Sequence, residues 1–316
     1  MNNLIFSLNA TMPVFLVMVV GYFLYKFGFT NDEFLKTANR FVFKITLPCL
    51  LLMDMMQCDI KKIFDGKYVL YCALTTITCI IVIWGLSKLL FKDKSLVGEF
   101  VQCSYRGSAA ILVIALLESI STNAKMAPLM MLGSVPIYNI FAVIVLTIES
   151  PENKGKNAKD NIKKSLKGIC TNPIILSILG GMLLSVLDIH FLPIVENTIT
   201  KIGSITTPLA LIVIGGGFKG KKAIKAIKPT VIATCIKLIV QPMIFLPVAI
   251  SFGFSGEKIV AALIMLGAPT TATSYVMAKS MGHEGVLSSS VIALTTLLSA
   301  FSITIWIFIL KTHGII

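Results

Sequence analysis

The sequence predicts an all-α integral membrane protein with ten transmembrane helices, arranged as two inverted five-helix repeats. Three observations support this fold class: an apolar composition, long apolar runs along the whole chain, and an internal repeat. Of the 316 residues, 56% are hydrophobic and only 14% are charged. A soluble domain of this length is normally less apolar. The composition therefore indicates that lipid, and not water, surrounds most of the chain.

The apolar runs predict helices and not the strands of a barrel. Each is roughly 18 or more residues long, enough to cross a hydrocarbon core of roughly 30 Å as a helix. Backbone groups in lipid must be bonded internally, which leaves helices or a closed barrel. Barrel strands alternate in polarity, whereas runs such as AILVIALL (110–117) do not. The predicted spans are 8–27, 34–56, 67–91, 97–119, 126–148, 171–188, 193–217, 229–252, 258–280 and 285–310.

The basic residues lie between the apolar runs. The formal net charge is +13, but nucleic-acid binding would require Lys and Arg gathered on a folded soluble surface. Their positions are typical of loops that set membrane topology. The loops after the third, fifth and seventh predicted helices are rich in Lys, and Lys26 precedes the loop after the first, whereas the loops on the other side hold fewer. We therefore expect a multi-pass protein of the cell membrane, with both termini outside the cytoplasm and no nucleic-acid partner.

Metal, cofactor and enzyme sites are not indicated. The seven cysteines lie in or beside apolar segments and include no CxxC pair, and no histidine stands at metal-ligand spacing. No Ser/His/Asp or Cys/His set can be proposed either. We therefore expect no cofactor, no metal and no enzymatic activity.

One long polar segment divides the chain. Residues 149–168 separate two groups of five predicted helices, in 1–148 and 169–316. Because the segment is basic, we interpret it as a cytoplasmic linker between the halves.

The two halves share a sequence repeat. TMPVFLVMVVG (11–21) aligns with TNPIILSILGG (171–181) at an offset of 160 residues. The same offset, without a gap, places Pro48 of ITLPCLLL on Pro208 of ITTPLALI. Because five is an odd number, the second half must enter the membrane from the opposite side. Inverted repeats are common in secondary transporters, where they expose a midplane site alternately to each side.

The fourth and ninth predicted helices are candidates for interruption. In inverted-repeat carriers the site usually forms where helices are broken. Gly107 falls on Gly267 at the offset of 160. Pro269 removes a backbone donor and is followed by Thr270, Thr271 and Ser274. A simple proline kink, with Ser and Thr bonded to their own helix, remains the alternative. The candidate hinge or helix-breaking residues are Pro48, Pro208 and Pro269.

Two basic residues lie inside apolar segments, Arg106 and Lys237. A charge there is costly and normally faces a cavity, so each is a candidate counter-charge for an anion. The alternative is a side chain that reaches the membrane interface or pairs with another helix. No pair of acidic residues occupies a predicted membrane centre, which disfavours a cation or proton antiporter with a buried carboxylate pair.

Taken in order, these segments resemble the auxin efflux carrier family, which includes plant PIN-type carriers and bacterial permeases associated with malate or malonate. The resemblance implies a bile-acid-carrier-like or PIN-like fold, with a scaffold domain, a transport domain and substrate held beside the crossing of the fourth and ninth helices. The segments that carry it are ITLPCLLL (45–52), YRGS (105–108), PIYN (136–139), TNPIILSILGG (171–181), TPLALIVIGGGF (207–218), KLIVQP (237–242) and GAPTTATSYVMA (267–278).

The fourth helix departs from the family pattern. Arg106 matches the Arg of the family's Arg-Ser-Asn run, but Gly107 and Ser108 replace its Ser and Asn, and residues 110–117 lack the family's later Pro. Because of these departures, some polar contacts with the substrate are expected to come from positions outside the fourth helix. The complete set of candidate substrate-binding residues is Arg106, Gly107, Ser108, Tyr138, Asn139, Lys237, Pro269, Thr270, Thr271 and Ser274.

The function expected from the resemblance and the buried charges is secondary transport of a small organic anion, such as a carboxylate or auxin-like acid. Alternating access would take place at the crossing. Two alternatives remain open: a sodium-coupled bile-acid-type symporter, and a membrane receptor that does not transport. The expected partners are the organic anion, the lipid bilayer and, as a further alternative, a second copy of the chain in a homodimer.

Overall fold

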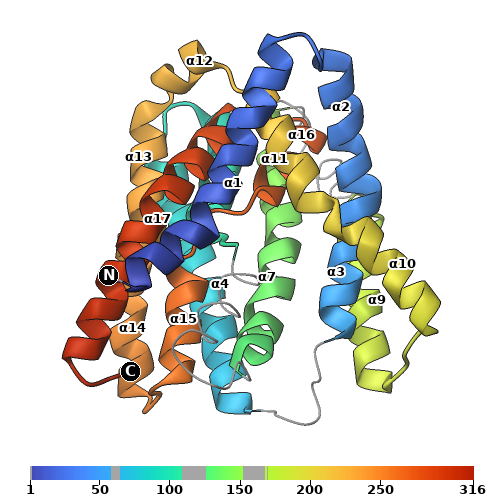
Figure 1. Cartoon of the computed structure of the whole chain (residues 1–316). Coiled ribbons are helices and arrows are strands. Elements are labelled where there is room, and N and C mark those ends of the chain that lie inside the picture. The colour runs from blue at the N-terminus through green and yellow to red at the C-terminus, as the bar shows by residue number, and fades with distance from the viewer. Residues whose placement is uncertain (1, 58–64, 109–125, 152–167, 169) are drawn as a thin grey trace.

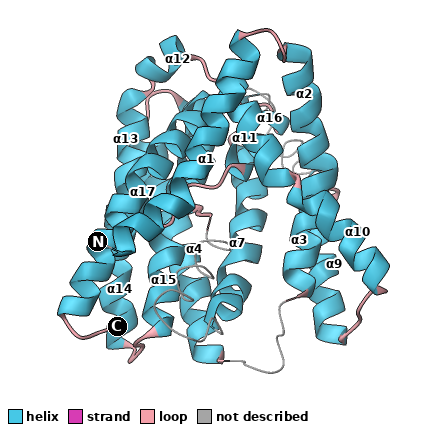
Figure 2. Ribbon diagram, viewed as in Figure 1, coloured by secondary structure: helices cyan, strands magenta, loops and turns pink. Residues whose placement is uncertain are grey.

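The computed structural model describes residues 2–57, 65–108, 126–151, 168 and 170–316. All regular structure in these residues is helical, without a strand (Figure 2). The helices form one bundle in which the chain passes repeatedly from end to end (Figure 1). The all-helical prediction is confirmed.

Helices occupy every predicted span. The elements that fill the described part of the ten spans are α1 (Asn2–Lys26), α2 (Asp32–Phe41) with η1 (Val42–Thr46) and α3 (Leu47–Met56), α4 (Gly66–Leu90), α5 (Val97–Tyr105), α7 (Met126–Ile148), α9 (Pro173–Leu187), α10 (Pro193–Ser204) with α11 (Thr206–Gly216), α13 (Ile227–Cys235) with η4 (Ile236–Val240) and α14 (Gln241–Ser251), α15 (Glu257–Gly267) with α16 (Thr273–Ser280), and α17 (Val286–Thr312). Two short helices, η2 (Lys94–Leu96) and α12 (Gly220–Lys225), lie in connections.

Several of these helices suit a membrane. Among the described residues, five are long and apolar enough to cross one: Gly66–Leu90, Leu129–Ile148, Pro193–Gly216, Ile227–Ser251 and Val286–Thr312. Thr11–Lys26 and Pro173–Leu187 are apolar but shorter. The count of ten crossings and the inverted repeat stay predictions, and most of the 149–168 segment lies outside the described residues.

Prolines explain two wide turns in otherwise continuous helices. The π-helical turns η1 and η4 end two residues before Pro48 and Pro242. A proline cannot donate to the carbonyl four residues earlier, and a π turn accommodates the lost bond. For Pro242 the freed oxygen is that of Leu238, which accepts a hydrogen bond from Trp306 Nε1 at 3.0 Å. The helix is therefore widened at Pro48, and not interrupted there. Pro208 instead follows the junction of α10 and α11.

Glycines bring two pairs of helices into backbone contact. A Cβ atom added at Gly21 of α1 would overlap the backbone of Ile212 in α11, and one at Gly181 of α9 would overlap the backbone of Leu52 in α3. Both members of the first contact stand 160 residues from the corresponding members of the second, the offset found in the sequence. The two close contacts are therefore equivalent positions in the repeat.

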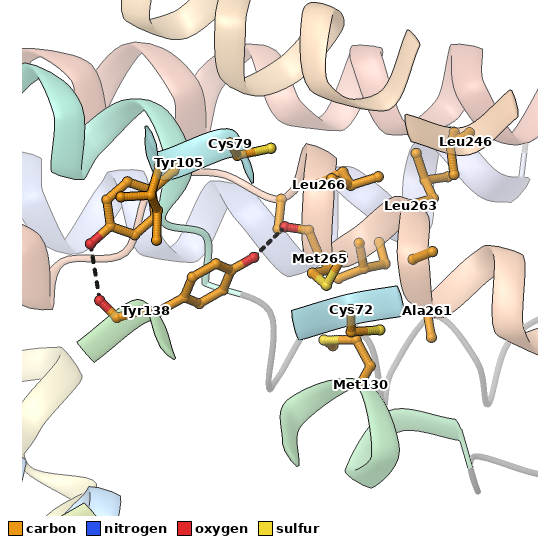
Figure 3. Close-up of a cluster of buried hydrophobic side chains, with 14 of the residues drawn as sticks. Cys72, Cys79, Tyr105, Met130, Tyr138, Leu246, Ala261, Leu263, Met265 and Leu266 are labelled. Atoms are coloured by element: carbon orange, nitrogen blue, oxygen red, sulfur yellow. Dashed lines mark hydrogen bonds between the residues drawn. The ribbon is translucent and has the colours of Figure 1, made fainter. Parts of the chain in front are cut away.

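Buried apolar side chains form two clusters. One lies among α4, α5, α7, α13 to α15 and α17 and includes Tyr68, Phe100 and Leu263; Figure 3 shows part of it. The other lies among α1 to α3, α7, α9, α11 and α16 and includes Leu47 and Ile178. Each cluster takes helices from both sides of the 149–168 segment. The packing units therefore cut across the two halves of the sequence.

Candidate functional site

Two helices stop inside the bundle and touch where they stop. After α5 the backbone of Arg106 is extended (φ −84°, ψ 127°), and after α15 that of Ala268 is extended (φ −66°, ψ 151°). The Ser108 N–H donates to the Pro269 carbonyl oxygen at 2.8 Å. We call this meeting of residues 106–108 with residues 268–272 the crossing. Both helices end within their predicted spans, at Tyr105 and Gly267. Residues 109–125, on which the predicted interruption of the fourth helix depends, lie outside the described residues, so this interruption stays a prediction.

Three donors from two other segments satisfy the last carbonyls of α5. The final turns of a helix leave carbonyl oxygens without an intrahelical partner, and inside a membrane each needs a donor. None of the three donors belongs to α5. They are Thr270 Oγ1 to the Cys103 oxygen at 2.8 Å, Gln241 Nε2 to the Ser104 oxygen at 2.7 Å and Lys237 Nζ to the Tyr105 oxygen at 3.1 Å.

Lys237 also binds the end of α15. Because Pro269 has no N–H, the Met265 oxygen lacks its helical donor. That oxygen accepts from Lys237 Nζ at 3.0 Å and from the Tyr138 hydroxyl at 3.1 Å, the second bond being drawn in Figure 3. Tyr105 and Met265 are again 160 residues apart. The fully buried ammonium thus joins equivalent carbonyls at the C-terminal ends of two half-helices, where the helix dipoles are negative.

The ammonium of Lys237 leaves little room for other groups. A Cβ atom at Gly107 would lie 3.1 Å from Lys237 Nζ and 3.3 Å from the Ala268 oxygen. Among the described residues, no carboxylate lies within ion-pair distance of Lys237. Its charge is therefore opposed by helix ends, and a side chain at position 107 would require these neighbours to shift by a few tenths of an ångström.

Arg106 is buried among neutral groups. Only 4% of it is exposed. Nη2 donates to Asn139 Oδ1 at 2.6 Å and Nη1 to the Met277 sulfur at 2.7 Å. A thioether is a weak acceptor, and a guanidinium carries five donors. Within the described part of the chain no carboxylate forms an ion pair with Arg106. The guanidinium therefore keeps N–H groups that could donate to an anion.

The hydroxyl groups of the ninth predicted helix differ in whether they are hydrogen-bonded within the protein. Thr270 is used within the protein, since its N–H also donates to Thr295 Oγ1 at 3.1 Å. Thr271 Oγ1 lies 3.2 Å from Thr273 Oγ1 and its residue is partly exposed. Ser274 is fully buried and its hydroxyl has no partner among the described residues. Ser274, in the first turn of α16, and Thr271, just before that helix, therefore remain candidates for contact with a ligand.

The geometry divides the predicted residues into two groups. Arg106 and Ser274 keep donor groups that no described residue accepts, and the Thr271 hydroxyl contacts only that of Thr273. Asn139 is occupied within the protein, since its Oδ1 accepts from Arg106 and its amide N–H donates to the Val135 oxygen at 2.9 Å. The remaining candidates at the crossing are occupied with protein contacts: Gly107, Ser108, Tyr138, Lys237, Pro269 and Thr270. Pro48 and Pro208 lie away from these contacts, in the first turns of α3 and α11.

Sequence reasoning missed three residues. Gln241 lies four positions after Lys237, on the same helix face, and this spacing could have revealed it. Glu99, 1% exposed, accepts from the N–H groups of Gly285 and Ser288 at 2.8 and 2.9 Å and so caps the first turn of α17. Its isolated position in an apolar segment was the only signal. Met277 had no sequence signal, because no sequence pattern indicates that a thioether will contact a guanidinium.

Long apolar helices interrupted around buried polar groups are the architecture of membrane transporters. The chain belongs to the membrane transport protein family, whose model matches residues 6–307, and this confirms the resemblance to the auxin efflux carriers. It is a family of transporters and not of enzymes. No curated protein matches the chain significantly. The protein is therefore a multi-pass membrane protein of a transporter family.

Proposed function

We propose that the protein is a secondary transporter of a small organic anion, such as a carboxylate or auxin-like acid, which it carries by alternating access at the crossing. The observation that carries this proposal is Arg106, a buried guanidinium whose partners Asn139 and Met277 are neutral. A charge kept in such a place is normally balanced. A substrate carboxylate is the balancing group.

The carboxylate binds between Arg106 and the N-terminal turn of α16. It replaces the Met277 sulfur as acceptor, since a carboxylate can take two parallel hydrogen bonds from a guanidinium. The Ser274 hydroxyl, which has no partner among the described residues, donates to it, as does the Thr271 hydroxyl when it turns away from Thr273 Oγ1. The positive end of the α16 dipole adds to the attraction.

Alternating access uses two inverted halves, 1–148 and 169–316, with ten crossings of the cell membrane and both termini outside. Two features support this arrangement: the equivalent glycine contacts of α1 with α11 and of α9 with α3, and the equivalent carbonyls bound by Lys237. Pro48, Pro208 and Pro269 mark the places where helices deform as the halves exchange conformations.

Lys237 favours this function over sodium-coupled symport. In carriers with broken helices, carbonyls at half-helix C-termini coordinate the coupling ion. Here the carbonyl oxygens of Tyr105 and Met265 already bind an ammonium group. Uptake that does not depend on sodium is the expected result, and sodium dependence would support the symporter instead. Substrate binding without any counterflow would support a receptor.

The test is counterflow in proteoliposomes against a panel of dicarboxylates and indole acids. Arg106→Gln should weaken binding of the transported anion by about 1–3 kcal/mol, the range for hydrogen bonds to charged groups. Arg106→Lys should restore only part, because the planar fork is lost. Arg40→Gln is the matched control, since Arg40 is the other arginine of the chain and is exposed. A folded Arg106→Gln protein with unchanged affinity would refute the proposal.

A further inference from the structure

A cavity of about 500 Å³ lies between α2, α11 and α16, elements that stand close together in Figure 1. Four lysines from three segments line it: Lys36 of α2, Lys219 and Lys222 at the start of α12, and Lys279 of α16. We call this space the basic cavity. It is larger than a small organic acid requires and falls within the usual size of ligand pockets.

Three of these ammonium groups are free. Lys222 forms an ion pair with Glu284 at 2.8 Å. Lys36, Lys219 and Lys279 make no hydrogen bond or ion pair with any described residue, and all three are exposed. The second carboxylate of the lining, that of Asp32, accepts from the Tyr25 hydroxyl at 3.1 Å. Three free lysines against this one carboxylate leave two positive charges without a partner.

The lining also offers neutral polar groups. The Tyr275 ring is buried, and its hydroxyl has no hydrogen-bond partner among the described residues. A Cβ atom at Gly217 would lie 2.6 Å from this hydroxyl, so the glycine makes room for it. The Asn39 amide donates to Ser280 Oγ at 2.9 Å, while its buried Oδ1 atom lacks a donor.

Helix α16 connects the basic cavity with the crossing. Tyr275 and Lys279 line the cavity, whereas Met277 of the same short helix contacts Arg106. The α16 helix therefore forms the wall between the two places, with Thr271 just before it and Ser274 in its first turn. A small solute held in the cavity lies one helix away from Arg106.

We propose that the basic cavity is a second anion site, which captures a small dianion of the dicarboxylate class before it reaches Arg106. The inference rests on the proposed function and narrows its substrate. One guanidinium at the crossing balances one carboxylate, whereas two unpartnered charges in the cavity favour a ligand with two. A soluble dianion is the occupant, because the free ammonium groups come from three separate segments and line one partly open cavity that water reaches.

Counterflow with a charge-matched pair of probes tests the capture site. Succinate and its monoamide succinamate have nearly the same shape but differ by one negative charge. In Lys36→Gln/Lys279→Gln the KM for succinate should rise about tenfold and that for succinamate about threefold or less, with kcat unchanged, since Coulomb energy scales with ligand charge. The control Lys221→Gln/Lys228→Gln alters exposed lysines that do not line the cavity, and salt screens these within about 8 Å.

A thiol-labelling experiment measures binding of succinate in the cavity and does not depend on transport. Val286 lines the cavity and is half-buried, so Val286→Cys places a thiol there, with Cys49, Cys58, Cys170 and Cys235 replaced by Ser so that the remaining cysteines are the buried Cys72, Cys79 and Cys103. Succinate should slow modification of this thiol several-fold, also in the Arg106→Gln background, and succinamate much less. The two lysine substitutions should abolish this protection.

The outcomes separate the two proposals. If the wild-type protein carries an indole acid but no dicarboxylate, or if succinate gives no protection, the capture site is refuted while the proposed function stands. If no anion is carried but succinate still protects the thiol, the proposed function fails and the capture site stands. Protection by phosphatidylglycerol vesicles and not by succinate would assign the cavity to lipid and overturn the inference.

Discussion

Replacement of Lys237 by Met tests how the crossing is held together. The change removes the ammonium and keeps a long unbranched side chain. Two hydrogen bonds from a charged group, each of about 1.5–3 kcal/mol, disappear. Against this, the cost of burying a cation, several kcal/mol, is recovered. The Met265 oxygen keeps the Tyr138 hydroxyl, so only the Tyr105 oxygen is orphaned. The expected net loss in the free energy of unfolding is about 1–3 kcal/mol.

Unfolding of the purified protein in mixed micelles, with increasing dodecyl sulfate and circular dichroism as the signal, gives this free energy. Lys228→Met is the control, because Lys228 is an exposed lysine at the start of the same helix. Lys237→Arg should restore little, since Gly107 and Ala268 leave no space for a guanidinium. A Lys237→Met protein as stable as the wild type would show that desolvation outweighs the two hydrogen bonds. The reasoning that Lys237 joins the half-helices would then be wrong.

Three further predictions concern packing, pH and topology. Gly181→Ala should destabilise by about 1–3 kcal/mol in thermal unfolding because its Cβ meets backbone, whereas Gly180→Ala, which meets only a side chain at 3.6 Å, should be neutral or stabilise by up to about 1 kcal/mol. The hydrogen bond from Lys258 lowers the pKa of Asp65, so this pair stabilises the protein above the unfolded pKa of about 3.9 and loses its effect as pH falls further. The stability difference from Asp65→Asn should shrink below pH 4 and stay under about 1 kcal/mol, since the pair is a third exposed. A reporter fused after Ile316 should be accessible only from outside the cell, and a cytoplasmic reporter would contradict the ten-helix topology.

Helix positions could be predicted because hydropathy acts locally. The predicted span 67–91 corresponds to α4 at Gly66–Leu90, and 285–310 to α17 at Val286–Thr312. The end of α5 at Tyr105 could not be placed in this way. Its last carbonyls are satisfied by groups from distant segments, and without such donors a continuous helix would be the only acceptable structure in lipid. Tertiary contacts therefore decide where this helix stops.

The buried site could be predicted only in part. Arg106 and Lys237 were visible as charges in apolar runs, and Pro269 as a missing donor. Their partners were not, because Lys237 binds carbonyls 132 and 28 residues away in the chain. Nothing in one sequence distinguishes a lysine that binds helix ends from one that binds a substrate. Glu99 was overlooked for the same reason, since its partners lie 186 and 189 residues away.

The two buried cations of the crossing, Lys237 and Arg106, differ in whether protein groups oppose their charge. Lys237 is opposed by two half-helix ends whose dipoles are fixed in the protein, so its charge is balanced in every occupancy state. Arg106 is opposed by an amide oxygen and a thioether, neither of which carries a net charge. In a medium of low dielectric constant this difference is large, because an unbalanced charge is far more costly there than in water. Arg106 is therefore the cation of the crossing whose charge no described group opposes, and for this reason the proposed anion site is placed beside Arg106 and not beside Lys237.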